Sequence, residues 1–512
     1  MTTRDRNSRI AFNTITLYIR TFIVMIISFL ASRIMLEQLG VEDYGLNNLI
    51  SGVVAMFGFL NMSMGTAVQR FFSVEESKEE GVSAKKIYGS AMLIHVIISL
   101  ITLLLLEVFA LFFLYRLNIP AERLGVAQWV FQFSSLTLIM GILAVPAEAF
   151  LRSKEEFSKL AIIDIFEAVI RVGILYLLYI SPYDKLWTIA FLTFLLKFLC
   201  NMAIWIIAIM IYGDVAKPYL YYEKTLFVKM ISFSMLLLLS IASSMAYWQG
   251  LVMMINVFFG VAINAAYGIG HQIKVAVDRF LFNFKQSTVP QLMSAQASGD
   301  DSRLKKLIYF STKLTFVMSL MVVVPVIFET DFILTVWLKN PPEFTTRFVQ
   351  LGFVISVLSS FSYYIKQAIH ATGKVTGLSI ATSINYVINI AAIYLLLKLG
   401  YGFYFTMYVS IVMEVIAIII TFVYAKLTFN FNVGDFIFRI VLRSLLFCVI
   451  MVGCFIAMNA VMSDGWLRLG LNLILSLLLS LGSLYILMNK DERGVIFGYL
   501  DKIISKIIRK NR

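Results

Sequence analysis

Residues 10–72 read IAFNTITLYIRTFIVMIISFLASRIMLEQLGVEDYGLNNLISGVVAMFGFLNMSMGTAVQRFF, and this stretch decides the fold class. It predicts a long apolar helix, a tight turn at 39–45 and a second long apolar helix, each able to cross a hydrocarbon core of roughly 30 Å. Two arginines, Arg20 and Arg33, interrupt the first helix. Because a guanidinium inside a membrane helix is costly, it normally faces a water-filled cavity or a partner and marks a path for substrate or ions.

The composition of the whole chain is that of an all-α polytopic membrane protein. Of its 512 residues 60% are hydrophobic and 14% are charged, whereas about one quarter are charged in ordinary globular domains. The apolar runs are continuous rather than alternating, which excludes a β-barrel. By run length we expect about 14 spans, at 11–36, 45–69, 88–115, 126–150, 160–181, 186–212, 226–256, 261–284, 307–337, 346–370, 376–398, 402–425, 437–462 and 467–488.

The distribution of basic residues predicts the orientation. With a cytoplasmic N-terminus, the cytoplasmic connections and tails hold roughly 28 Lys and Arg residues and the outer ones roughly 7. Both termini should therefore face the cytoplasm, and the net charge of +13 is a topological signal rather than a nucleic-acid footprint. The tail 491–512 places apolar residues on one helical face and basic residues elsewhere, which predicts a helix lying on anionic lipids or docking a partner.

The two halves of the chain match at a shift of about 220 residues. LGVEDYG at 39–45 recurs as FGVAINAAYG at 259–268, KKIY at 85–88 recurs as KKLIY at 305–309, and RSKE at 152–155 has a looser counterpart in TGKV at 372–375. The unit spans six helices, an even number, so both copies share one orientation, and such folds bind substrate near the midplane between the repeats. We expect two six-helix lobes at 1–212 and 213–425, two extra helices at 426–490 and the basic tail at 491–512.

At the level of motifs the sequence resembles the polysaccharide-export, or O-antigen flippase (Wzx-type), branch of the superfamily that also contains multidrug extruders and lipid II flippases. The resemblance lies in SRIMLEQLGVEDYGL at 32–46, TAVQRFF at 66–72, NFKQSTVPQ at 283–291 and the helix count, and it covers the chain to about residue 425. It implies a V-shaped, MATE-like transporter in the bacterial inner membrane. Its substrate would be an undecaprenyl-pyrophosphate-linked oligosaccharide, the repeat unit of O-antigen, capsule or exopolysaccharide, flipped by alternating access beside the glycan polymerase machinery.

Six cations are candidates for binding the pyrophosphate. The family motifs carry over Arg33 and Arg70, while Arg20 and Lys197 are singled out because neither has a carboxylate one turn away on its own helix. Arg20 and Lys197 therefore either face the cavity or pair with another helix. Lys313 lies two turns inside its helix and either faces the cavity or reaches the surface.

The remaining candidates lie on helices that carry both signs of charge. Lys274 and Asp278 are one turn apart and should neutralise each other, which leaves Arg279 as the less compensated cation. Arg33 can pair with Glu37 in the same way, or extend to the membrane surface.

Two carboxylates, Asp164 and Glu414, are candidates for ion coupling. Glu167 and Arg171 are one turn apart and should pair, so that Asp164 needs a partner from another helix. Glu414 is central in its span and has no local cation. A buried carboxylate can carry a proton, and pairing between helices explains such residues equally well.

The resulting hypothesis is a flippase, not an enzyme, driven by the membrane potential, H⁺ or Na⁺. Two alternatives remain: a cation-coupled multidrug or small-molecule exporter of the same fold, and a membrane glycan polymerase or glycosyltransferase. The exporter predicts uncompensated carboxylates in the N-terminal lobe, and the enzyme predicts a sizeable loop, whereas the outer connections here hold about a dozen residues or fewer. The three cysteines lie in apolar runs and no Walker or zinc-type spacing is present, so we expect no cofactor, no metal and no nucleic acid.

Overall fold

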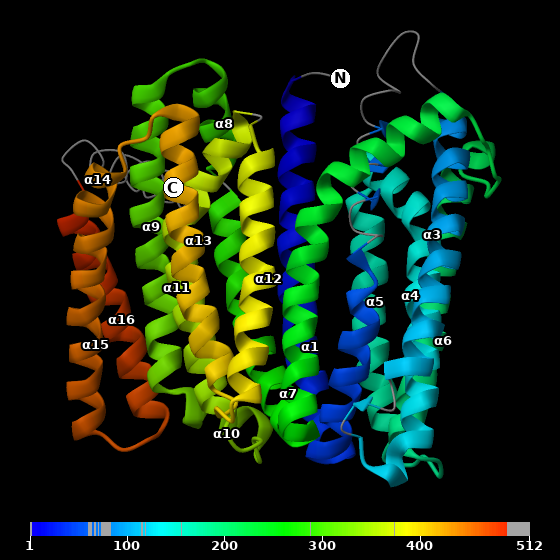
Figure 1. Ribbon diagram of the computed structural model, residues 1–512, viewed down its shortest axis with the longest axis horizontal. Helices are drawn as coiled ribbons and strands as arrows, with labels where there is room; N and C mark the ends of the chain where they lie inside the picture. Colours follow the sequence, from blue (N-terminus) through cyan, green and yellow to red (C-terminus); the bar gives the residue numbers. More distant parts are fainter. Residues whose placement is uncertain are drawn as a thin grey trace, which may run out of the picture. The chain divides into compact units, whose positions relative to one another are not determined.

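The computed structural model describes residues 3–59, 64–65, 68–69, 71–72, 83–113, 116–117, 119–154, 156–286, 288–372 and 374–488. Over these residues every regular element is a helix (Figure 1). Arg70 and the tail 491–512 lie outside this part of the chain, so their proposed roles stay sequence predictions.

The chain is a multi-pass membrane protein. Eleven helical stretches among the described residues are long and apolar enough to cross a membrane. Two of them bend at a glycine and each consist of two helices, and α5 (Phe157–Leu177) is of similar length but carries four charged residues. Counting both halves of the bent helices together with α5 confirms the 14 helices expected from the sequence.

The first compact unit comprises Met1–Gly268 and Tyr394–Phe403. Within it α4 packs against α3 and α6, and α1 packs against α5. Its helices, besides α5, are α1 (Thr3–Met56), α3 (Ala84–Phe113), α4 (Leu124–Ser153), α6 (Lys185–Tyr212), the first part of α7 (Lys224–Gln286) and two 3₁₀ turns at Ala121–Arg123 and Gly213–Val215.

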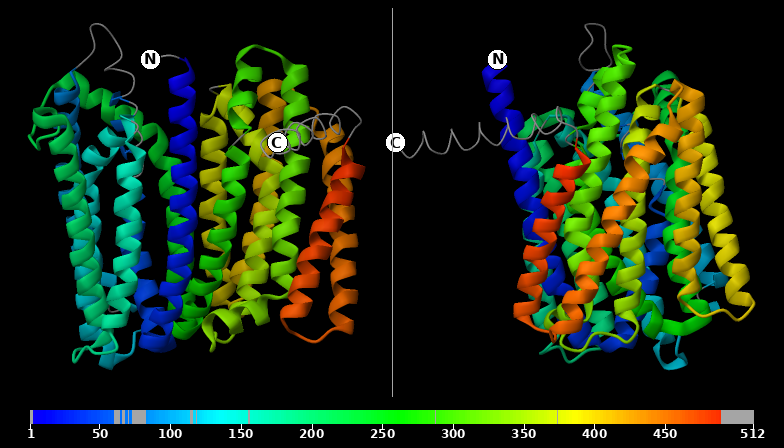
Figure 2. Two further views of the ribbon diagram at one scale, coloured as in Figure 1. Left: turned by 180° about the vertical axis from the view of Figure 1, so that it is seen from behind. Right: turned by 90° about the vertical axis from the view of Figure 1, so that its left-hand side faces the viewer.

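The second compact unit comprises Ile269–Ile393 and Tyr404–Arg512. Within it α11 packs against α9 and α13, and α16 packs along α9 (Figure 2). Its helices are the end of α7, α8 (Val289–Ala297), α9 (Asp301–Phe328), α10 (Thr330–Leu338), α11 (Thr345–Ala371), most of α12 (Thr376–Lys398), α13 (Phe405–Phe429), α14 (Val433–Phe436), a π-helical turn at Ile437–Val441, α15 (Leu442–Val461) and α16 (Trp466–Leu487). The lobe boundaries at 212 and 425 stay sequence predictions.

The internal repeat is visible in the backbone. The non-helical residue inside α1 is Gly40, with φ 73° and ψ 177°, and the one inside α7 is Gly260, with φ 82° and ψ −177°. These two residues correspond under the shift found in the sequence, and glycine is the residue that adopts this conformation readily. A single residue therefore makes the bend that the sequence predicted as a turn spanning 39–45.

The helices that follow these glycines pack closely within the first unit. A Cβ atom on Gly45 would lie 2.1 Å from the backbone oxygen of Val261 and 3.3 Å from the Cβ atom of Ala265. A Cβ atom on Gly268 would lie 2.6 Å from Nδ2 of Asn48. Gly45 and Gly268 are the last residues of the two copies of the motif, and each of them meets the helix of the other copy. Small side chains are therefore required at the contact.

One predicted span, 307–337, is wrong at its far end. Helix α9 stops at Phe328 and α10 begins at Thr330, with Glu329 between them. The carboxylate of Glu329 is held by a side chain from α16, and the hydroxyl of Thr330 donates to the carbonyl oxygen of Val326 at 2.6 Å. These polar contacts lie at a one-residue interruption of the helix, where hydropathy alone predicts continuity.

Candidate functional site

The intramembrane charges of the first unit form ion pairs between helices. Arg20 Nη2 on α1 lies 2.6 Å from Asp164 Oδ2 on α5, and Lys197 Nζ on α6 lies 2.9 Å from Glu167 Oε2 on α5. Asp164 and Glu167 are three residues apart, so α5 presents both carboxylates from neighbouring turns. Between 20% and 35% of each of these four side chains is exposed, so none of the four is fully buried by the protein.

This arrangement answers two questions that the sequence left open. Arg20 and Lys197 are paired with another helix, and Asp164 obtains the partner from a different helix that it was predicted to need. The predicted pairing of Glu167 with Arg171 is wrong. Lys197 takes that carboxylate, and Arg171 is exposed with no ion pair among the described residues.

The network continues onto α4. Arg152 Nη2 lies 2.5 Å from Glu148 Oε1, one turn away, and Glu148 acts electrostatically on Asp164. The group therefore holds three cations and three carboxylates and is close to neutral. One polar group is left over, because the buried Nε of Arg20 has no hydrogen-bond partner among the described residues.

Arg33 and the turn motif do not belong to this network of ion pairs. Arg33 is half-buried and has no ion pair among the described residues, so the alternative in which it pairs with Glu37 is not observed. Asp43, inside the motif, accepts a hydrogen bond from Arg123 Nε at 2.9 Å, and Arg123 Nη1 also donates to Asp184 at 2.6 Å. These bonds tie the bend in α1 to the starts of α4 and α6, so the motif is architectural.

The second unit contains buried lysines. Lys274 Nζ lies 2.6 Å from Asp278 Oδ2, which confirms the predicted pair, and the Lys274 side chain packs where Gly352 has no Cβ atom. Arg279 is exposed and has no ion pair among the described residues, and Lys313 on α9 is buried.

Lys285 was missed by the sequence reasoning, although it lies in the quoted motif NFKQSTVPQ. Its side chain is 8% exposed, and its Nζ atom lies 5.3 Å from the centroid of the Tyr363 ring. No described carboxylate lies within ion-pair distance of it. The groups that act on it electrostatically are Asp278, Lys274, Glu414 and Lys366. This neighbourhood holds more lysines than carboxylates, and Glu414 supplies one of the two negative charges.

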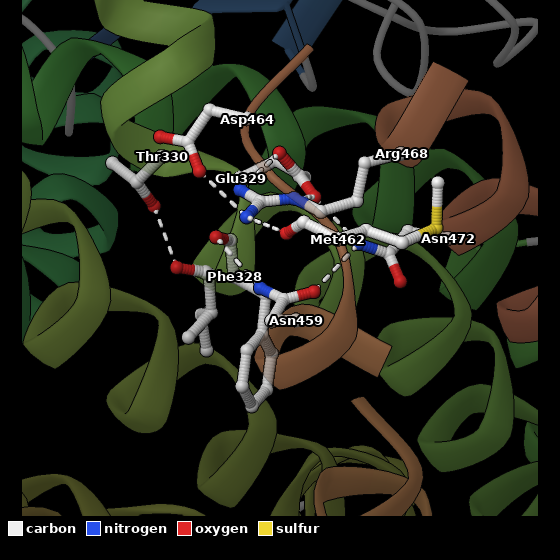
Figure 3. A network of polar contacts seen from close by, with 9 residues as sticks. Phe328, Glu329, Thr330, Asn459, Met462, Asp464, Arg468 and Asn472 are labelled. Carbon is white, nitrogen blue, oxygen red and sulfur yellow. Dashed lines mark hydrogen bonds and ion pairs between the residues drawn. The ribbon is translucent and has the colours of Figure 1, made fainter. Parts of the chain in front are cut away.

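A buried polar cluster joins α9 to α16 (Figure 3). Glu329 is fully buried and accepts hydrogen bonds from Arg468 Nε at 2.7 Å, from Arg468 Nη2 at 3.0 Å and from Asn472 Nδ2 at 2.5 Å. Asn472 also donates to Asn459 Oδ1, and Arg468 pairs with Asp464 at 2.6 Å. The last hairpin is therefore fixed to α9 by a charge-assisted network.

A pattern in the sequence of α16 indicates this cluster. Polar residues recur on α16 at positions 468, 472, 476, 480 and 483, which is the spacing of one helical face. Pro325 cannot donate a hydrogen bond to Met321 one turn earlier, and the hydroxyl of Ser476 donates to that carbonyl oxygen at 2.7 Å instead. A polar stripe on a membrane helix thus marks the face that packs against protein.

Over the described residues, no group of three or more His, Cys, Asp or Glu side chains could hold a metal ion.

Comparison with known proteins identifies the fold. A family profile described as MatE matches residues 18–177. The lipid II flippase MurJ, solved in an inward closed conformation, matches with a TM-score of 0.70 at 16% identity, over 95% of this chain and 100% of the flippase chain. No curated protein matches the sequence.

Two multidrug transporters give shorter matches. A MATE family transporter in an inward-facing conformation has a TM-score of 0.61 at 13% identity and covers 79% of this chain and 94% of its own. The MATE multidrug transporter DinF-BH in complex with R6G has a TM-score of 0.59 at 13% identity and covers 83% of this chain and 97% of its own. The chain therefore has the fold shared by MATE transporters and the lipid II flippase.

Proposed function

We propose that this chain is a flippase that moves an undecaprenyl-pyrophosphate-linked oligosaccharide across the bacterial inner membrane, with both termini in the cytoplasm. The observation that carries the proposal is the extent of the fold matches. The lipid II flippase is matched over its whole length by 95% of this chain, while the two multidrug transporters cover 79% and 83%. The more complete match to a lipid II flippase supports a lipid-linked substrate.

The charges support an anionic headgroup. Arg20 has a buried Nε–H without an acceptor, and Lys285 has no carboxylate within ion-pair distance among the described residues. A pyrophosphate offers the oxygen acceptors that an arginine or a lysine binds strongly. Arg33, Lys197, Arg279 and Lys313 are further proposed contacts, and Asp164 and Glu414 are the proposed coupling carboxylates.

In this mechanism the substrate competes with a carboxylate for Arg20. Asp164 holds the guanidinium when no substrate is present, and a phosphate oxygen takes its place when the headgroup arrives. The released carboxylate can then take up a proton, which links substrate capture to ion binding. The polyprenyl chain stays in the lipid throughout.

The test is complementation of a host that lacks its own flippase, with surface glycan as the readout. Arg20→Ala should lower glycan output by about tenfold or more, because a hydrogen bond to a charged group contributes about 1.5–3 kcal/mol. The matched control is Arg171→Ala, an exposed intramembrane cation without an ion pair, which should keep wild-type output. The variant Arg20→Ala/Asp164→Ala separates binding from structure: it should stay inactive, and recovery would assign Arg20 a purely structural role.

Cation-coupled multidrug export is the second candidate. The MatE profile match at 18–177 and the multidrug transporters among the solved structures favour it. Efflux of a cationic dye from cells expressing the protein distinguishes the two functions. Dye efflux without glycan output would favour the exporter, and glycan output without dye efflux would favour the flippase.

A further inference from the structure

A row of buried polar groups runs along one face of α3 in the first unit. Tyr88, His95, Ser99 and Thr102 are spaced by seven, four and three residues, which places them on one side of a helix with 3.6 residues per turn. All four side chains are at least nine-tenths buried. The row therefore passes through the interior of the unit rather than along its surface.

The polar atoms of this row have no partners in the part of the chain that the structure describes. The Tyr88 hydroxyl, the His95 Nε2, the Ser99 Oγ and the Thr102 Oγ1 are each buried there without a hydrogen bond. Buried polar groups in native proteins are nearly always satisfied, and ordered water is the partner where protein groups are not. Four such atoms on one face indicate a hydrated path rather than isolated defects.

Helix α4 continues the row toward a carboxylate. Rings of Phe109 and Phe131 lie 6.3 Å apart and those of Tyr88 and Phe150 lie 6.0 Å apart, which sets the antiparallel register of α3 and α4. Ser135 follows Phe131 by one turn and so comes level with the Thr102 end of the row. Its hydroxyl is also buried without a partner.

One ionisable group, the carboxylate of Glu107, lies beyond the Thr102 end of the row and is reached through α4. Gln132 Nε2 donates to Glu107 Oε2 at 3.3 Å, three residues before Ser135 on α4. From Tyr88 to Glu107 the helix is about 28 Å long at 1.5 Å per residue. The hydrocarbon core of a bilayer is about 30 Å thick, so the path has the length of a membrane crossing.

His95 has the right hydrogen-bonding state for a relay. Its Nδ1 lies 2.7 Å from the carbonyl oxygen of Ala91, which can only accept, so Nδ1 carries the hydrogen and Nε2 keeps a lone pair. Among the described residues, no ion pair involves the imidazole, which is buried. Nε2 can therefore take a proton from one water molecule and release it to the next, with only O–H and N–H bonds made and broken.

We propose that this face of α3, together with the adjoining residues of α4, forms a proton path in which internal water molecules link Glu107, Ser135, Thr102, Ser99, His95 and Tyr88. The path makes the proton the ion that drives transport. That coupling rests on the proposed function, whereas the path itself does not.

Proton flux tests the path directly. The full-length protein is reconstituted in liposomes with a pH-sensitive dye inside, and a potassium gradient with valinomycin sets the potential. His95→Gln cannot take up a proton and Thr102→Val removes a hydroxyl at nearly constant shape. Each should lower the flux by about tenfold or more, a factor that corresponds to about 1.4 kcal/mol.

The matched control is Ser90→Ala. Ser90 is also buried on α3 without a partner, but it lies two residues from Tyr88 and therefore about 200° around the helix from it. Its flux should equal that of the wild type. Wild-type flux no greater than that of empty liposomes, or unchanged flux in both His95→Gln and Thr102→Val, would overturn the path.

Deuterium exchange at the C2 position of histidine gives a second readout that does not depend on variants. The chain has three histidines, so each is resolved by mass spectrometry, and His370 is exposed and serves as the internal reference. A hydrated His95 should exchange despite its burial. No exchange at His95 during complete exchange at His370 would contradict a water-filled path.

Glycan output separates the two proposals. If the wild type conducts protons and the variants lower the flux as expected, but the protein does not export glycan, the proton path stands and the flippase function is rejected. If both hold in the wild type, His95→Gln must also lose glycan export, and unchanged export would reject the coupling.

Discussion

Removing the guanidinium of Arg468 should leave the Glu329 carboxylate buried and without its main partner. Glu329 is 0% exposed and the side chain of Arg468 is 8% exposed, and two hydrogen bonds of 2.7 Å and 3.0 Å join them. Breaking a buried pair by deleting one partner costs about 3–5 kcal/mol, because a charge remains in a low-dielectric interior. Arg468→Leu should therefore destabilise the second unit by about that amount.

The matched control is Arg439→Leu. Arg439 also pairs with a carboxylate, Asp435, at 2.5 Å, but 66% of its side chain is exposed. Exposed pairs contribute about 0–1 kcal/mol, so this variant should unfold close to the wild type. Thermal unfolding of the detergent-purified proteins, followed by size-exclusion chromatography after heating, measures both midpoints under one condition.

A second variant separates charge from packing. Glu329→Gln/Arg468→Leu removes both charges, and replacing both partners of a buried pair is often neutral. The double variant should regain most of the stability lost in Arg468→Leu. Equal midpoints for Arg468→Leu and Arg439→Leu, or a double variant no more stable than Arg468→Leu, would refute the reasoning.

Two further predictions concern packing and pH. Gly45→Ala should lower the unfolding midpoint, because the added Cβ atom would lie 2.1 Å from a backbone oxygen and overpacking costs about 1–3 kcal/mol. The control Gly141→Ala on α4, where nothing lies within 4 Å of the added Cβ atom, should keep the wild-type midpoint. Equal midpoints for the two variants would contradict the close contact at Gly45. For Asp184 burial raises the pKa, but hydrogen bonds from Arg123 and from the Trp187 N–H outweigh it, so that the pKa is lowered overall. The stabilisation that the Asp184 carboxylate provides is therefore present above about pH 4 and is lost as the pH falls through the folded-state pKa. The unfolding midpoints of the wild type and of Asp184→Asn, measured by the same assay from pH 7 to pH 3, should converge in acid. A constant difference between the two midpoints would contradict the assignment.

The helices could be predicted from the sequence because the bilayer imposes a local rule. Each span must supply a long enough apolar run to satisfy its own backbone, and that requirement is visible in any window of the chain. The bends at Gly40 and Gly260 could also be predicted, since both residues lie in the repeated turn motif. Span 307–337 failed at Glu329, where the side chain that captures the carboxylate lies 139 residues further along the chain.

The charge pairs could not be predicted from the spacing of residues within one helix. Glu167 and Arg171 satisfy the spacing for a pair within one helix, but α6 packs beside α5 and brings Lys197 to the same carboxylate. Arg20 likewise finds Asp164 only because α1 packs on α5. Which charges neutralise one another thus depends on which helices are neighbours, and hydropathy does not report that.

The Glu329–Arg468 pair also sets an order of events during synthesis. At a translation rate of about 5–20 residues per second, the 139 residues between the partners take roughly 7–28 s to be made. During that interval the end of α9 has already been delivered to the membrane while its carboxylate has no guanidinium to bind. The nascent chain must keep this carboxylate hydrated until the final hairpin arrives.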